Sequence, residues 1–114
     1  MYNDVEIKEY SEEGFKPLVV FDAWRVALLN HSEKFSKITY LERHMETDEV
    51  FVLLAGTATL YIGEEMQPYP MEQGKIYNVK KASWHQIIVS TDAKVLVVEN
   101  SDTTKDNSEY IYFA

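Results

Sequence analysis

Cysteine is absent from this chain of 114 residues. Its absence excludes a disulfide framework, a thiolate metal site and a cysteine nucleophile, so any bound metal must be held by histidine and carboxylate side chains. Long apolar runs are missing too, because no segment approaches the ~20 apolar residues that cross a membrane. The N-terminal sequence lacks an apolar core of the signal-peptide type. We therefore expect a cytoplasmic protein with no membrane partner.

Positive charge is also scarce. The chain has 19 acidic residues against 11 lysines and arginines, which gives a formal net charge of -8. Such a surface repels phosphate backbones and anionic lipids, so we expect no nucleic-acid partner. A chain of this length can bury one hydrophobic core without disulfides. We expect residues 1–114 to form a single domain.

Helical periodicity is absent as well, and short runs of β-forming residues take its place. Residues 18–29 fit either two strands or one bent strand, while Pro68 and Pro70 keep residues 67–71 out of any central strand. The pattern predicts an all-β protein, an antiparallel β-sandwich or barrel. The expected strands cover residues 5–10, 18–29, 39–46, 49–54, 57–62, 76–79, 84–89, 94–99 and 110–113.

The stretch TYLERHMETDEVFVLLAG, residues 39–56, contains the most chemically informative residues. If its first half is extended, Tyr40, Glu42, His44 and Glu46 share one face, so a carboxylate and an imidazole lie side by side. The next expected strand begins with a further carboxylate, Glu49. The run closes at a glycine, residue 56, as expected where the chain turns. A second informative stretch, GKIYNVKKASWH, covers residues 74–85 and ends in a histidine.

These two stretches resemble the two motifs of the cupin family, G-x5-H-x-H-x3-4-E-x6-G and G-x5-P-x-G-x2-H-x3-N. Glu42-x-His44-x4-Glu49-x6-Gly56 keeps the spacing of the first motif with glutamate in place of its first histidine. Gly74-x10-His85 keeps the spacing of the second. The 17 residues between the two glycines suit the small bacterial members. Three positions of the second motif differ, where this chain has Lys80, Ala82 and Val89.

The resemblance implies a cupin fold, the double-stranded β-helix or jelly roll, with a metal inside the barrel. The residues at the ligand positions are Glu42, His44, Glu49 and His85. Imidazole and carboxylate donors suit Mn, Fe, Ni or Zn, and two glutamates would balance a divalent ion. The alternative fourth ligand is Glu46 in place of Glu42, if the strand ends early.

Two functions stay open at this point. The first is a metal-dependent enzyme that acts on a small polar metabolite, with Glu46, Tyr40 or Tyr77 moving the proton. The second is a non-catalytic cupin with a decayed metal site, which binds a small ligand or a protein partner. We also expect a homodimer in which residues 5–10 or 110–113 lie against the partner's sheet, because exposed strand edges favour association. The competing arrangement pairs these terminal strands within their own barrel.

Overall fold

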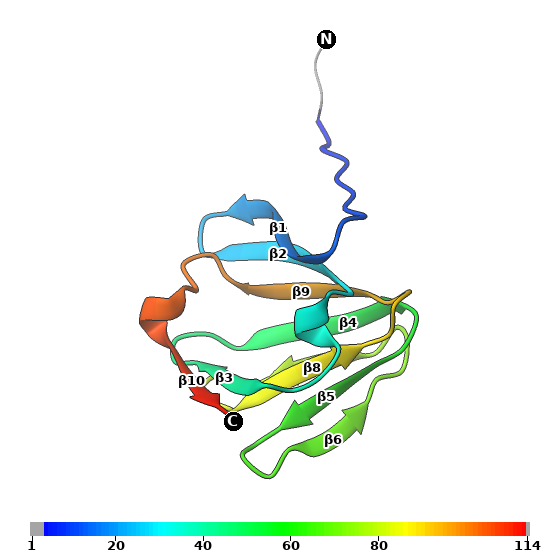
Figure 1. Ribbon diagram of the computed structural model, residues 1–114. Coiled ribbons are helices and arrows are strands. Elements are labelled where there is room, and N and C mark those ends of the chain that lie inside the picture. The colour runs from blue at the N-terminus through cyan, green and yellow to red at the C-terminus, as the bar shows by residue number, and fades with distance from the viewer. Residues whose placement is uncertain (1–3, 114) are drawn as a thin grey trace.

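The computed structural model describes residues 4–113, and this part of the chain folds into two five-stranded antiparallel sheets (Figure 1). Sheet A contains, in spatial order, β1 (Gly14–Phe21), β2 (Trp24–Asn30), β9 (Lys94–Asn100), β4 (Glu49–Ala55) and β7 (Ile76–Val79). Sheet B contains β10 (Ser108–Tyr112), β3 (Tyr40–His44), β8 (His85–Val89), β5 (Ala58–Ile62) and β6 (Gln67–Pro70). The expectation of an antiparallel β-sandwich is confirmed.

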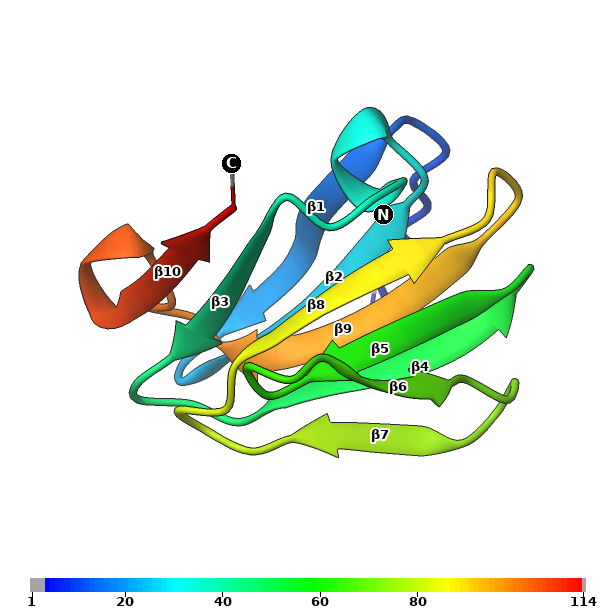
Figure 2. The same cartoon turned by 60° about the horizontal axis from the view of Figure 1, so that its bottom comes forward.

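Alternation along the strands places the core between the sheets. In β4 the residues that start the alternation, Glu49, Phe51 and Leu53, are all buried, and in β9 Val95 and Val97 are completely shielded from solvent. Burying one such aliphatic or aromatic side chain stabilises the fold by about 1.5–3 kcal/mol. Figure 2 shows the two sheets stacked on each other. Buried apolar side chains from both sheets, such as Val97 of β9 and Ile87 of β8, belong to one core cluster.

The N-terminal prediction was wrong, because residues 5–10 form no strand. They run away from the two sheets (Figure 1), and the side chains of Val5 and Ile7 are 72% and 86% exposed. Alternation alone does not make a strand, since the backbone also needs a neighbour to pair with. At the other terminus, β10 pairs with β3 of the same chain, so residues 110–112 close the edge of their own sheet.

The remaining strands lie near the expected positions but differ at their ends, since β1 begins at Gly14 and β3 ends at His44. Residues 18–29 divide into two strands that turn at Asp22 and Ala23, and the proline-bearing strand β6 lies at an edge of sheet B. Two 3-10 helices, η1 (Glu33–Phe35) and η2 (Lys105–Asn107), lie in the long connections. Within residues 4–113, no helix is long and apolar enough to cross a membrane.

Candidate metal centre

Sheet A contributes a polar row at one end of the sandwich. Arg25 of β2 lies directly opposite Glu99 of β9, and one step deeper Ala27 and Phe51 flank Val97. Because strands alternate, Glu49 of β4 faces the same interior as Phe51 and lies beside Glu99. The row of Arg25, Glu99 and Glu49 therefore caps an otherwise apolar sheet face.

Sheet B presents the complementary residues. Glu42 and His44 of β3 point to the same side, and His85 of β8 is paired directly with Glu42. On the other side of β3, the residues of β10 opposite Glu42 and His44 are Tyr110 and Ser108. The register of three strands thus brings both histidines to the level of the sheet A carboxylates.

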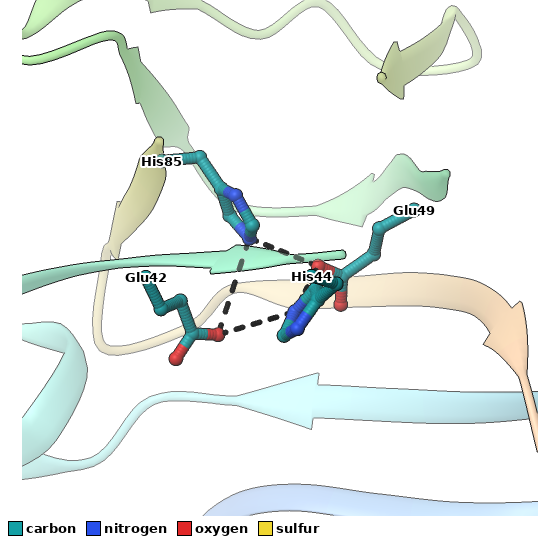
Figure 3. A group of neighbouring side chains, drawn as sticks. All are labelled: Glu42, His44, Glu49 and His85. Atoms are coloured by element: carbon teal, nitrogen blue, oxygen red, sulfur yellow. Dashed lines mark hydrogen bonds and ion pairs between the residues drawn. The ribbon is translucent and has the colours of Figure 1, made fainter. Parts of the chain in front are cut away.

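The four residues at the predicted ligand positions converge on one point (Figure 3). Glu49 Oε1 lies 3.1 Å from His44 Nε2 and 3.0 Å from His85 Nε2. Glu42 Oε1 lies 3.5 Å and 3.9 Å from the same two nitrogens. One donor atom from each residue lies within 4.8 Å of all the others, and three of the four residues are buried.

The histidines and glutamates of the cluster shift one another's pKa values. Burial disfavours the charged form of His44, but the hydrogen bonds and charges of Glu42 and Glu49 outweigh burial and raise its pKa from 6.5 to about 10. For His85 burial is likewise outweighed, chiefly by Glu49, and the pKa is raised. For Glu49 burial would raise the pKa, yet the two imidazoles lower it to about 2. At neutral pH the His44 imidazolium therefore faces the Glu49 carboxylate, and the same carboxylate favours the protonated form of His85.

The outer nitrogens of the two rings are also anchored. His85 Nδ1 lies 3.0 Å from the backbone carbonyl oxygen of Ser83, which can only accept, so Nδ1 carries the proton. His44 Nδ1 lies 2.8 Å from Ser108 Oγ. In the neutral form of His85, this arrangement leaves the Nε2 lone pair directed at the cluster. Such partners orient metal-binding histidines in proteins.

Glu99 is a member of the site that sequence reasoning missed. Its Oε2 accepts hydrogen bonds from Nε and Nη2 of Arg25 at 3.2 and 2.8 Å. Its Oε1 is buried, has no hydrogen-bond partner among residues 4–113, and lies 4.0 Å from His44 Nε2. Burial and the charge of Glu49 raise the pKa of Glu99 to about 7, although Arg25 opposes this rise. The sequence pattern could have identified Glu99, because it continues the alternation that places Val95 and Val97 on the buried face of β9.

The cluster lies in a cavity of about 190 Å³. Of the three residues considered for proton transfer, only Tyr40 lines this cavity. Glu46 lies beyond the end of β3 with an exposed side chain, so it is not near the cluster as a ligand or as an acid. Tyr77 lines a second cavity, where its hydroxyl accepts a hydrogen bond from the backbone N–H of Glu72 at 2.8 Å.

The donor set fits a divalent transition ion. Two imidazole nitrogens and two carboxylate oxygens are the donors that Zn, Fe, Ni and Mn accept in proteins, and two carboxylates neutralise the charge of the ion. The buried Oε1 of Glu99 supports the fit, because a buried carboxylate oxygen without a partner costs about 1–3 kcal/mol. A cation or its bound water would supply the missing partner.

Comparison with known proteins identifies the fold. No protein-family model matches the sequence, and no curated protein is similar to it in sequence. Among solved structures, a cupin-2 domain protein from Shewanella frigidimarina superposes with a TM-score of 0.65 at 17% identity, covering 80% of this chain and 84% of that one. The Streptomyces nucleoside dehydratase Pac13 superposes with a TM-score of 0.71 at 7% identity, covering 93% and 85%. A protein from Neisseria meningitidis superposes with a TM-score of 0.60 at 16% identity, covering 83% of this chain and 89% of that one.

Proposed function

We propose that this chain, which has the fold of a small cupin, binds one divalent transition ion through Glu42, His44, Glu49 and His85 and holds a small polar metabolite beside it. The observation that carries the proposal is the convergence of four donor atoms within 4.8 Å at a cavity. Likeness to Pac13, whose structures include complexes with uridine, supports a small-molecule ligand. Mn, Fe, Ni and Zn all suit the donors.

Each residue of the proposed site has a distinct task. The bound ion would supply a Lewis acid that polarises an oxygen of the metabolite. Ser83 and Ser108 orient the two imidazoles through their Nδ1 atoms. Tyr40, at the cavity wall, is positioned to move a proton to or from a bound molecule.

Metal analysis of protein purified without a nickel column tests the site. We expect about one first-row transition ion per chain after incubation with Mn, Fe, Ni or Zn. His44→Ala and His85→Ala should each abolish uptake, because each removes a buried donor. His31→Ala is the matched control and should retain full uptake, because His31 does not line the cavity. Wild-type metal content in both site variants would show that the ligands are elsewhere.

A second function, ligand binding without turnover, is supported by the hydrogen bonds within the cluster. Without an ion, both imidazoles already bond to Glu49 at 3.0 and 3.1 Å, so their Nε2 atoms have a partner within the cluster. An organic molecule could then bind to these groups directly. A protein that takes up none of the four metals but still binds small polar molecules in the cavity would favour this function.

For assembly we propose a homodimer of one-domain chains. The N-terminal segment supports this proposal, since Val5 and Ile7 are exposed and β1 leaves one edge of sheet A unpaired in the described part of the chain. Exposed apolar side chains next to a free sheet edge favour association. The C-terminal segment contributes less, because β10 is paired along one side with β3.

A further inference from the structure

Two lysines at the wall of the cavity form no ion pair within the described part of the chain. Lys34 of η1 and Lys105 of η2 both line the cavity that holds the cluster. Across residues 4–113, neither side chain forms an ion pair, although the chain has 19 acidic residues. Arg25, the third cation of the lining, is by contrast engaged by Glu99 at 2.8 Å.

Lys34 is held in place by aromatic rings. Its Nζ lies 5.6 Å from the ring centre of Phe35 and 5.7 Å from that of Tyr40. A cation at this distance is attracted by the ring face. Burial opposes its charge, but Tyr40 and Glu42 outweigh burial and raise the pKa of Lys34, so it is charged at neutral pH.

The charges of the loaded cavity do not balance. The three carboxylates of Glu42, Glu49 and Glu99 would be offset by the Arg25 guanidinium and a divalent ion. The ammonium groups of Lys34 and Lys105 are then left over, in a protein whose overall charge is -8. A local positive excess in an acidic protein attracts anions to this cavity.

The rest of the cavity fits a small organic molecule. Its volume of about 190 Å³ is well above the ~10–15 Å³ that a single water molecule needs. Tyrosine hydroxyls at the wall, from Tyr40 and Tyr110, add hydrogen-bond donors for a carboxylate. Apolar side chains form much of the remaining wall, namely Phe15, Leu29, Phe35, Phe51 and Ile87.

We propose that the ligand of this cavity is a small organic acid, whose carboxylate binds the lysine side chains of the cavity wall, Lys34 and Lys105, while a second oxygen reaches the cluster of Glu42, His44, Glu49 and His85. The contact of the second oxygen with the cluster rests on the proposed metal site, whereas the contact of the carboxylate with the lysines does not. Apolar walls favour a short carbon chain over inorganic phosphate.

The test compares 3-hydroxybutanoate with its neutral amide, a pair that differs in charge and little in shape. Ligand-observed NMR on the zinc-loaded protein should show the acid binding at least about tenfold more tightly, a difference of about 1.4 kcal/mol. Lys34→Met and Lys105→Met should each reduce this preference several-fold with zinc content unchanged, and Lys34→Arg should restore most of it. Lys16→Met is the control, because Lys16 is exposed on β1 and outside the cavity.

The outcomes separate this inference from the proposed function. Equal affinity for acid and amide, or an acid preference that both methionine variants retain, would overturn the lysine assignment even if zinc binds. Tighter binding of inorganic phosphate than of the acid would overturn the carboxylate assignment. A lysine-dependent acid preference in a protein that binds no metal would support the inference while refuting the metal site.

Discussion

Metal binding at the cluster should release protons, because the neighbouring carboxylates favour the protonated form of both imidazoles and coordination must displace those protons. His44, with a pKa of about 10, is almost fully protonated at pH 7. The pKa of His85 is also raised, by Glu49 above all other partners. Coordination requires neutral imidazole. We therefore expect about one to two protons released for each ion bound at pH 7.

The direction of the pH dependence follows from these pKa values. A raised histidine pKa stabilises the metal-free fold fully below pH 6.5, and this contribution to the free energy of unfolding is lost as the pH rises through about 10. Metal affinity changes in the opposite direction. Each displaced proton makes affinity rise about tenfold per pH unit, so two protons give about a hundredfold rise per unit near neutrality.

Titration calorimetry measures the release directly, through the dependence of the binding heat on the ionisation enthalpy of the buffer. Glu49→Gln is the informative variant, because it removes the carboxylate that both imidazoles contact and should lower proton release as well as zinc affinity. His31→Ala should behave as wild type. Tight zinc binding with less than about half a proton released at pH 7 would refute the imidazolium description of the cluster.

Three further outcomes are expected. Glu42→His should keep or strengthen the affinity for zinc and nickel, while Glu42→Leu should weaken the affinity for every metal about tenfold or more in a chelator competition. Unchanged metal affinity in the leucine variant would remove Glu42 from the ligand set. Gly56→Ala should lower the free energy of unfolding, measured in urea, by at least about 2 kcal/mol. The reason is that Gly56 has φ +71° and an added Cβ would lie 2.6 Å from Ala93 Cα. A loss below about 1 kcal/mol would contradict this geometry. Deleting residues 1–10 should convert the proposed dimer to a monomer in sedimentation experiments, and a dimer that survives the deletion has its interface elsewhere.

The sequence predicted the four-residue cluster because strand alternation and the resemblance to the two cupin motifs point to the same residues. Alternation places Glu42 and His44 on one face of β3, and it places Glu49 on the inner face of β4. The spacing of the second motif located His85. Gly56 was also identified correctly as a turn residue that needs a positive φ.

The misses involve residues whose position depends on the end of an element or on a distant strand. Glu46 left the expected face because β3 ends at His44 and the chain bends there. Glu99 and Arg25 meet through the pairing of β2 with β9, 74 residues apart in sequence, which no local pattern encodes. Ala82 shows a different effect, since it adopts φ 65° at the position of the motif's glycine. The chain keeps the positive φ of this turn although it has alanine there and not glycine, the residue that adopts a positive φ most easily.

Glutamate at position 42 gives the cluster the same formal charge with and without an ion. In the metal-free state, two imidazolium ions would balance Glu42 and Glu49, and the pKa of both histidines is raised in that direction. With a divalent ion bound, both rings would be neutral and the ion would balance the same two carboxylates. A histidine at position 42 would leave one carboxylate in the four-residue set, and its softer imidazole donor would offset that loss for zinc and nickel.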